Sequence, residues 1–462
     1  MFEKKIYVER RKKLRETLKS GVLLFLGNDE SPMNYPANPF LFRQDSTFLY
    51  YWGLDYDGLA AVIDIDEGKE IVFGDDITVA DIVWMGPQPT LKQKCEKIGV
   101  SEALPMKALK ETLDKAVSQG RKVHYLPPYR GNNVLKIQSL LGIPADSVKE
   151  KVSADFVKAV VNQRNYKSTE ELAEIGKALE MSYVMHTRAM EMSKPGMVEY
   201  EVYGAVEGIP LSMGGRISFP VIFSVNGETL HNHYHGNTMK DGQMVVHDSG
   251  AESPLHYSSD ITRTFPVGGK FTSQQRDAYQ IVLDSQKQAI EACKPGVPFR
   301  EVHLLAGKVL AEGLKGMGLM KGDMDEAVAA GAHAMFFQCG LGHMMGLDVH
   351  DMEDLGEVYV GYAGNIERSE QFGTCYLRLA RPLEPGFVIT VEPGLYFIPA
   401  LMDQWKAENK FADFINYSEL EKYRNFGGIR IEDDLLITKE GNRVLGRPIP
   451  KEVDDVESVC SM

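Results

Sequence analysis

Cysteine is scarce in this sequence of 462 residues. The five cysteines are widely spaced and include no Cys-x-x-Cys pair: Cys95, Cys293, Cys339, Cys375 and Cys460. A disulfide framework needs cysteines at short, recurring spacings, and a zinc finger needs closely spaced pairs of ligands. The pattern therefore indicates neither of these, and it is typical of a protein from a reducing compartment.

Positive charge and long apolar runs are also in short supply. There are 51 lysines and arginines against 65 aspartates and glutamates, which gives a formal charge of −14. Nucleic-acid-binding proteins usually present a basic face, so we expect no nucleic-acid partner. The apolar stretch GVLLFLG, residues 21–27, is too short and too far into the chain for a membrane span or a signal peptide. We therefore expect a cytoplasmic protein without a membrane association.

The order of helical and strand patterns predicts two domains. The segment 7–20 has helical spacing, whereas 21–28, 60–65 and 70–75 are apolar runs typical of buried strands, and 101–120 is again helical. Near Lys167 the pattern changes, because Ser168 and Glu171 form a capping-box signature ahead of a long helix. We predict an α/β domain over residues 1–165 and a second domain, of α+β type, over residues 166–462.

The second domain contains an internal repeat. KPGMVEYEV begins at Lys194 and KPGVPFREV at Lys294, and each follows a long helical segment. Further on, GQMVVHDSG (242–250) matches GFVITVEPG (386–394), with an acid at the same place between two glycines. The repeat superposes Asp248 on Glu392. It predicts two half-domains that each contribute an acidic strand to a shared centre.

Acidic residues at the predicted strands indicate a metal centre. Asp248 and Asp260 lie on what we expect to be neighbouring strands, and a carboxylate facing a core is unfavourable unless a cation neutralises it. His343, Glu392 and Glu432 could join them. These ligands suit two Mn²⁺, Co²⁺ or Zn²⁺ ions better than one structural zinc, and two such ions favour hydrolysis. The alternative is that the acids are solvated on loops, but apolar neighbours such as Val245 and Ile389 argue for buried strands.

These residues lie in motifs that resemble the pita-bread metallopeptidases, a family that includes methionine aminopeptidase, aminopeptidase P and prolidase. The motifs are DSGAESPLHYSSDITRTF (248–265), GLGHMMGLDVHD (340–351), VEPGLYF (391–397) and GIRIEDD (428–434). In addition, FRQDSTFLYYWGL (42–54) resembles the N-terminal domain of aminopeptidase P and prolidase, which methionine aminopeptidases lack. The resemblance implies a non-catalytic α/β domain followed by a catalytic pita-bread domain with an internal pseudo-two-fold repeat.

The resemblance also implies the ligand set of a dinuclear centre. Asp260 and Glu432 would bridge two divalent ions, preferably Mn²⁺ with Co²⁺ or Zn²⁺ as alternatives. Asp248 would complete one metal site, and His343 with Glu392 would complete the other. A hydroxide held between the ions would attack the scissile carbonyl of an Xaa-Pro bond. Glu392 would take the proton of the water and pass it towards the leaving nitrogen.

Further residues are implied on the substrate side. His350 would donate to the carbonyl oxygen, although it could also be a packed loop histidine. His231 matches the substrate-side histidine of the family, with His233 and His235 as rival candidates, or the cluster could be a solvated turn. Arg430 would hold a ligand carboxylate or a substrate, and the alternative is a surface arginine on a strand.

Two features bear on which type of Xaa-Pro peptidase this is. Arg378 matches the prolidase arginine that binds the carboxylate of a dipeptide, unless it is only a surface charge, and a long insert before Glu432 is also of the prolidase type. Cys339 stands where the family usually has a histidine on the substrate side, and a neutral thiol does not replace a cationic imidazole. The choice between dipeptidase and aminopeptidase therefore stays open.

We predict a dinuclear-metal exopeptidase that acts on proline-containing peptides and forms a dimer or a tetramer. A metal-independent binding module with the same fold, or a creatinase-like hydrolase, is the alternative, and loss of the ligands would mark it. A dinucleotide-binding protein is disfavoured because the Gly-x-Gly at 340–342 follows no clear strand. A dimetal phosphatase or nuclease would use similar ligands, but the acidic balance and the order of the motifs argue against it.

Overall fold

The computed structural model describes residues 1–462 and divides the chain into two compact units. Unit 1 comprises Met1–Arg164 and Asp354–Tyr359, and unit 2 comprises Asn165–Glu353 and Val360–Met462. No helix of the chain has the length and apolar character needed to cross a lipid bilayer.

Unit 1 is built on a five-stranded mixed sheet in the order β4-β3-β2-β1-β5. Its strands are β1 (Val22–Leu26), β2 (Ala60–Asp64), β3 (Lys69–Phe73), β4 (Glu102–Leu104) and β5 (Val123–His124). The central pairs β1–β2 and β2–β3 are antiparallel, and the outer pairs β3–β4 and β1–β5 are parallel. The helices are α1 (Lys4–Thr17), α2 (Ser46–Trp52), α3 (Val79–Met85), α4 (Leu91–Ile98), α5 (Ala108–Ser118), α6 (Gly131–Leu141) and α7 (Ala154–Arg164).

Helices cover both faces of this sheet because its strands are apolar on both sides. On one face Leu24 and Val62 belong to a core that includes Leu113 of α5. On the other face the ring of Phe25 contacts Trp52 of α2 and Phe156 of α7 at centroid distances of 5.6 and 5.2 Å. The predicted α/β character of the first domain is confirmed.

One part of the predicted helix over 101–120 is wrong. Residues Glu102–Leu104 form the edge strand β4, and α5 begins only at Ala108. Pro105 follows Leu104 directly, and the residue before a proline is disfavoured in helical geometry. The chain therefore pairs with β3 before the helix starts.

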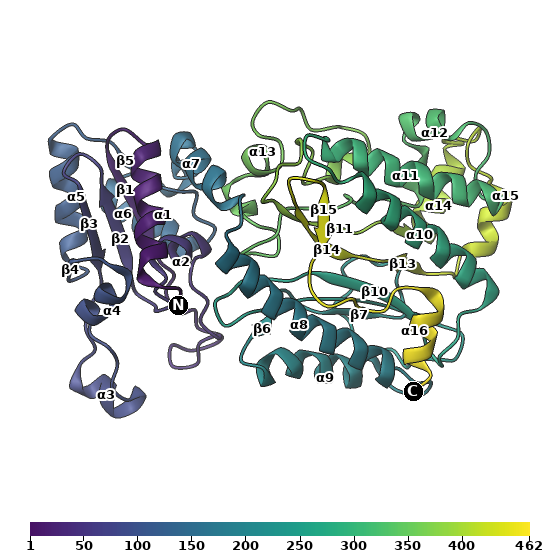
Figure 1. Ribbon diagram of the computed structural model, residues 1–462, viewed down its shortest axis with the longest axis horizontal. Helices are drawn as coiled ribbons and strands as arrows, with labels where there is room; N and C mark the ends of the chain where they lie inside the picture. Colours follow the sequence, from purple (N-terminus) through teal and green to yellow (C-terminus); the bar gives the residue numbers. More distant parts are fainter. The chain divides into compact units, whose positions relative to one another are not determined.

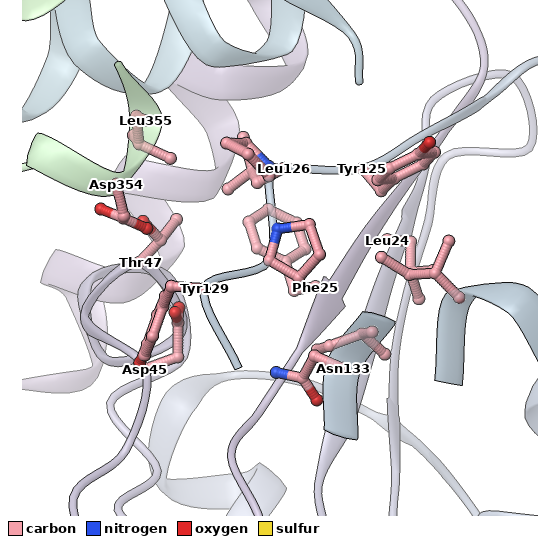
Figure 2. A pocket seen from close by; sticks show the side chains of 14 residues that line it. Leu24, Phe25, Asp45, Thr47, Tyr125, Leu126, Tyr129, Asn133, Asp354 and Leu355 are labelled. Atoms are coloured by element: carbon pink, nitrogen blue, oxygen red, sulfur yellow. The ribbon is translucent and has the colours of Figure 1, made fainter. Parts of the chain in front are cut away.

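A small cavity lies in unit 1 beside β1, with a volume of about 40 Å³ (Figure 2). Leu24 and Phe25 line it together with polar groups of Asp45 and Asn133. This volume has room for only a few water molecules, which is too little for a peptide.

Unit 2 contains two successive pairs of helices that confirm the predicted repeat (Figure 1). The pairs are α8 (Thr169–Met192) with α9 (Glu199–Ser212), and α10 (Ser273–Ala292) with α11 (Phe299–Gly316). Each pair is joined by a Lys-Pro-Gly turn whose glycine has a positive φ, +93° at Gly196 and +84° at Gly296. The amide of Gly196 donates to Met239 O and that of Gly296 to Leu383 O, so the two turns are anchored alike.

Short antiparallel sheets in unit 2 position the acidic residues. One has the order β10-β8-β7, with β7 (Ile222–Ser224), β8 (Met244–Ser249) and β10 (Ile261–Pro266), and another has the order β11-β14-β15, with β11 (Val388–Val391), β14 (Asp433–Ile437) and β15 (Asn442–Val444). Two strand pairs complete the framework, β12 (Gly394–Tyr396) with β13 (Gly428–Arg430) and β6 (Arg216–Ile217) with β9 (Ala251–Glu252). The other helices of unit 2 are α12 (Met324–Ala330), α14 (Pro399–Ala407), α15 (Tyr417–Leu420) and α16 (Val453–Cys460), whereas α13 (Glu357–Val360) belongs to unit 1 except for its last residue.

Candidate metal centre

The two aspartates of the first motif lie at two paired strands, Asp248 on β8 and Asp260 next to β10. Asp248 is on β8, and its partner across the ladder is Thr262 of β10. Asp260 stands immediately before β10, and its amide donates to Asp434 Oδ2 at 3.1 Å. Both aspartates are buried, and so are all residues of β8 and β10.

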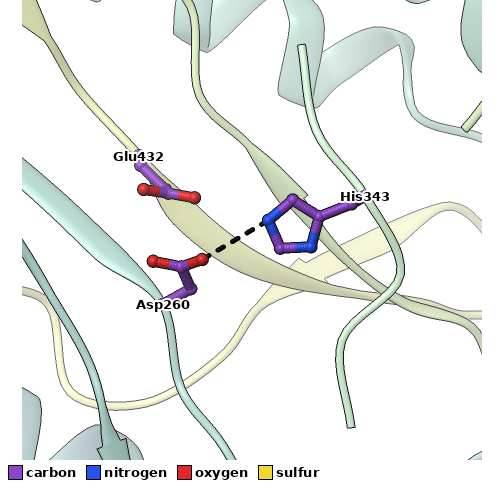
Figure 3. A group of neighbouring side chains, drawn as sticks. All are labelled: Asp260, His343 and Glu432. Atoms are coloured by element: carbon purple, nitrogen blue, oxygen red, sulfur yellow. Dashed lines mark ion pairs between the residues drawn. The ribbon is translucent and has the colours of Figure 1, made fainter. Parts of the chain in front are cut away.

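Asp260, His343 and Glu432 form the centre of the site (Figure 3). One ligand atom from each lies within 4.8 Å of the others, and His343 Nε2 is 3.3 Å from Asp260 Oδ2. The figure shows the imidazole and the two carboxyl groups turned towards one another from three separate segments. This is the arrangement that a bound cation needs.

Glu392 and Asp248 border this group. Glu392 follows β11, and its Oε1 lies 3.6 Å from His343 Nε2. Asp248 is held from the other side, because Arg430 Nη2 donates to its Oδ2 at 2.6 Å. The charge of Asp248 raises the pKa values of Asp260, Glu392 and Glu432, so it lies within electrostatic range of all three.

Unsatisfied oxygen atoms show that the centre fits a cation. Asp248 Oδ1, Asp260 Oδ1 and Glu432 Oε1 are each buried and accept no hydrogen bond. A buried carboxyl oxygen without a partner is strongly unfavourable, and each such atom in a native protein calls for an explanation such as a bound ion. Three of them beside an imidazole make a hard donor set that suits divalent ions.

The pKa values of the group point the same way. Burial, followed by the charges of neighbouring carboxyls, raises the pKa of Asp260 and of Glu432 well above the usual range. Burial also raises the pKa of Glu392 to about 7. For His343, burial lowers the pKa well below its usual value, so the ring stays neutral and has a lone pair for a metal.

Residues 173–439 match the model of metallopeptidase family M24, and residues 7–125 match that of the aminopeptidase P N-terminal domain. The chain belongs to metallopeptidase family M24. Known proteins are similar over nearly their whole length. The chain is 33% identical to the Xaa-Pro dipeptidase of Homo sapiens, over 97% of this chain and 90% of that one. It is 31% identical to the Xaa-Pro aminopeptidase of Escherichia coli K12, over 98% of this chain and 97% of that one.

Solved structures of M24 proteins share the fold of the whole chain. Zinc-substituted E. coli aminopeptidase P in complex with product matches with a TM-score of 0.81 at 30% identity, over 99% of this chain and 98% of that one. Proline aminopeptidase P II from Yersinia pestis matches with a TM-score of 0.82 at 30% identity, over the full length of both chains. The predicted fold class, an α/β domain followed by a pita-bread domain, is confirmed.

Arg430 of this M24 chain is buried, so its interpretation as a surface arginine is wrong. Besides Asp248, its guanidinium donates to Thr262 Oγ1 at 3.1 Å and to the Tyr396 hydroxyl at 2.9 Å. Thr262 in turn donates to Glu432 Oε2 at 2.7 Å. Arg430 therefore holds the carboxyl group of Asp248 directly and that of Glu432 through the hydroxyl of Thr262.

The sequence analysis missed the residues that hold these ligands in place. Thr262 lies on β10 and Asp434 on β14, and both are fully buried. Thr390 lies on β11, with its Oγ1 3.3 Å from Glu392 Oε1. Each stands two residues from a predicted ligand, so it shares the inward face of a strand. This spacing of two residues is the sequence signal that could have identified Thr262, Thr390 and Asp434.

His350 and Arg378 meet at a residue that the sequence analysis also missed. His350 Nδ1 is 2.6 Å from Glu353 Oε2, and Arg378 Nε is 3.4 Å from the same oxygen. The hydrogen bond from His350 lowers the pKa of Glu353 to about 2. The rings of His350 and His343 lie 4.3 Å apart, which places His350 at the border of the centre.

The structure separates the three histidines of the 229–237 segment. His231 is exposed, yet partial desolvation and the charge of Arg430 lower its pKa, so it lies within electrostatic range of the centre. His235 instead stacks on Tyr203 at 4.3 Å, and its Nδ1 lies 3.1 Å from Phe223 O, which is a packing role. His233 is exposed.

Cys339 lies near Tyr396, Glu392 and Arg430 at the other border of the centre. Burial, and then the charge of Glu392, raises the pKa of the Cys339 thiol to about 12. The thiol is therefore neutral at physiological pH and brings no cationic donor to this border.

Proposed function

We propose that this M24 chain hydrolyses the Xaa-Pro bond at the N-terminus of peptides or in dipeptides, as a metal-dependent exopeptidase. One observation carries the proposal: three buried carboxyl oxygens without hydrogen-bond partners lie beside a neutral imidazole. The chain that holds them is similar over nearly its whole length to Xaa-Pro dipeptidases and Xaa-Pro aminopeptidases.

We infer that five residues hold two divalent ions, most favourably Mn²⁺. The residues that would hold them are Asp248, Asp260, His343, Glu392 and Glu432, of which Asp260, His343 and Glu432 lie closest together. Two bound ions supply a hydroxide nucleophile at neutral pH and polarise the scissile carbonyl. The carboxyl-rich donor set supports Mn²⁺ over softer metals.

Three side chains then act on the substrate. Glu392, whose pKa burial raises to about 7, accepts a proton at Oε1 or Oε2 and returns it to the leaving nitrogen. His350, oriented by Glu353 through its Nδ1, presents Nε2 as a donor to the carbonyl oxygen. His231 donates from the exposed side of the centre.

The substrate side favours short peptides. Arg378 lies next to His350 through the shared Glu353 carboxyl, and a guanidinium fork at this place suits the terminal carboxylate of a dipeptide. Cys339 leaves more room and less charge at the opposite border than an imidazole would. We therefore propose that dipeptides are preferred and that longer peptides are also accepted.

We propose that residues 1–165 form a non-catalytic domain and residues 166–462 the catalytic domain, in a cytoplasmic homo-oligomer. The cysteine pattern supports the compartment, since it is typical of reducing conditions. We propose neither a nucleic-acid nor a membrane partner, on the basis of the formal charge of −14 and the lack of a long apolar run.

Hydrolysis assays on Ala-Pro, Ala-Pro-Ala and a phosphate ester, with added Mn²⁺ and after chelation, test the proposal. We expect both peptides to be cleaved with Mn²⁺, neither to be cleaved after chelation, and the ester to stay intact. Full activity after chelation would contradict the metal centre. Hydrolysis of the ester alone would identify a phosphatase, and binding without cleavage a binding module.

A further inference from the structure

A buried carboxyl group outside the centre has only amide N–H partners. Glu199, the first residue of α9, has no exposed surface. Its Oε1 accepts from Val225 N at 2.8 Å, and its Oε2 accepts from Asn237 N at 3.1 Å and Asn237 Nδ2 at 2.9 Å. Because no lysine, arginine or histidine is among these partners, the hydrogen bonds alone offset the loss of hydration.

These hydrogen bonds close the segment 225–237, which we call the histidine loop. Val225 and Asn237 are its two ends, so one carboxyl group joins them. Backbone contacts add to the closure, because Glu199 N donates to Asn237 O at 3.0 Å and Tyr200 N donates to His235 O at 2.9 Å. Within the loop lies His231, on which the charges of Arg430 and Asp248 act.

The start of the histidine loop also packs against a strand of the centre. A side chain at Gly227 would come within 2.8 Å of Gly428 O, on the strand β13 that carries Arg430. The loop therefore depends on a close approach of two backbones as well as on Glu199. Between these fixed points the loop is largely open to solvent, and Tyr234 is 65% exposed.

The internal repeat supplies a comparison within the chain. In the second Lys-Pro-Gly segment the position that corresponds to Glu199 is Phe299, which is also fully buried and also begins a helix. The turn and the helix start are thus made equally well with an apolar side chain. The second half makes the matching backbone contact, from Phe299 N to Arg381 O at 3.0 Å, without a carboxyl group. The carboxyl group of Glu199 therefore serves the histidine loop and not the turn.

We propose that Glu199 is a positioning residue, which closes the histidine loop so that His231 faces the metal centre. The inference rests on the proposed function, since the role of His231 is part of it. A glutamine at position 199 keeps the size but has one acceptor oxygen, and its NH₂ group would face an N–H donor of the loop. The loop would then open at one end.

The test compares Glu199→Gln with Glu201→Gln, which makes the same change two residues along α9. Glu201 is exposed and accepts only from Val198 N, a cap that glutamine also makes. We expect kcat/KM for Ala-Pro to fall about tenfold to hundredfold in Glu199→Gln, with unchanged metal content, and to stay at the wild-type value in Glu201→Gln. We also expect chymotrypsin to cut after Tyr234 several-fold faster in Glu199→Gln only.

A double mutant shows whether Glu199 acts through His231. In a His231→Ala background, Glu199→Gln should cause no further loss of kcat/KM. An equal loss in both backgrounds, or no loss in either, would overturn the inference. If Glu199→Gln fails to fold, Asn237→Ala, which removes one of the three donors, takes its place with the same expectations.

The cleavage rate after Tyr234 needs no catalytic activity. If the wild type has no peptidase activity but Glu199→Gln is cleaved faster than the wild type, the loop closure is upheld and the proposed function fails. If the wild type is active but the two proteins are cleaved at the same rate, the proposed function is upheld and the loop closure fails.

Discussion

Thr262 links two groups of the centre with a single hydroxyl, which donates to Glu432 at 2.7 Å and accepts from Arg430 at 3.1 Å. Thr262→Val keeps the shape of the side chain and removes both hydrogen bonds. Because outer partners orient metal ligands, we expect the affinity for Mn²⁺ to fall about 10- to 100-fold. Calorimetric titration of the metal-free protein measures this.

The matched control is Thr264→Val on the same strand. The hydroxyl of Thr264 contacts only the backbone of Arg430, at 3.0 Å from both its N and its O. Its loss should lower the stability of the fold and leave the affinity for Mn²⁺ within about twofold of the wild type. Equal affinities in the two variants would show that Thr262 does not orient Glu432.

We propose that Arg378 sets the preference between dipeptides and longer peptides. Arg378→Ala should raise KM for Ala-Pro about tenfold to hundredfold, because a charge-assisted hydrogen bond contributes about 1.5–3 kcal/mol. Ala-Pro-Ala has its carboxylate one residue further along, so its KM should change little. Steady-state kinetics on the two peptides measure the difference, and equal losses would place the enzyme on the aminopeptidase side.

At the residue scale, local spacing gave the motif residues but not their partners. Asp260, His343 and Glu432 were predicted from motifs, and they do converge. Glu199 was not predicted, because nothing near it in the chain shows which groups it meets after folding, whereas Glu353 stands only three residues after His350 and that spacing is a signal in the sequence. Glu353 pairs with His350 across one turn of a loop, and Glu199 meets a segment 26 to 38 residues away.

At the scale of elements, one buried ion pair holds the loop 343–351, which carries His343 and His350. Lys167 Nζ lies 2.9 Å from Asp351 Oδ2, and each side chain is 1% exposed. Asp351 N donates to Met344 O at 2.8 Å and closes the loop. Lys167→Met would remove the ammonium group beside the buried Asp351 carboxylate, so we expect a loss of about 3–5 kcal/mol in the free energy of unfolding. Urea denaturation measures it.

Lys110→Met is the control, because Lys110 pairs with Asp114 and the two side chains are 55% and 57% exposed. Exposed pairs contribute at most about 1 kcal/mol, so this variant should unfold close to the wild type. Peptidase activity should fall in Lys167→Met and persist in Lys110→Met. Comparable unfolding midpoints in the two variants would show that the buried pair does not stabilise the loop.

Elements with local signals were predicted well. The capping box at Ser168 and Glu171 is present, and α8 begins at Thr169 as that signature requires. β4 was missed, because three residues before a proline have too little pattern to distinguish a strand from a helix start. Its pairing with β3 depends on residues about thirty positions away.

At the scale of the whole molecule, metal and protons would compete for the carboxyl groups of the proposed ligands. The pKa of Glu392 is raised to about 7, and those of Asp260 and Glu432 are raised as well. Without metal, the folded protein therefore retains protons that the unfolded chain releases above about pH 4.5. The stability of the metal-free protein should fall as the pH rises through this window towards about 7.

Divalent ions replace those protons, so the increase in Tm on adding Mn²⁺ should grow between about pH 5 and pH 7. Thermal denaturation with Mn²⁺ and with a chelator, at several pH values in this range, measures the difference. A constant difference across the range would show that these carboxyls do not bind the metal.

Family-level features were predictable for the whole chain, whereas the subtype was not. Motifs spread from residue 42 to residue 434 indicated the fold that the solved relatives confirm. The proposed preference for dipeptides would depend on the space around Arg378 and Cys339, which sequence spacing does not give.

The centre joins segments that are remote in the chain, and this affects the order of folding. Thr262 and Glu432 are 170 positions apart, and Asp248 and Arg430 are 182 apart. Contacts of such separation form after the local helix pairs, because closing a long loop is entropically unfavourable until many contacts compensate. The chain must therefore build both halves before any metal can bind between them. Ions that arrive late in this way act mainly to slow unfolding, so they work as a latch on the finished molecule.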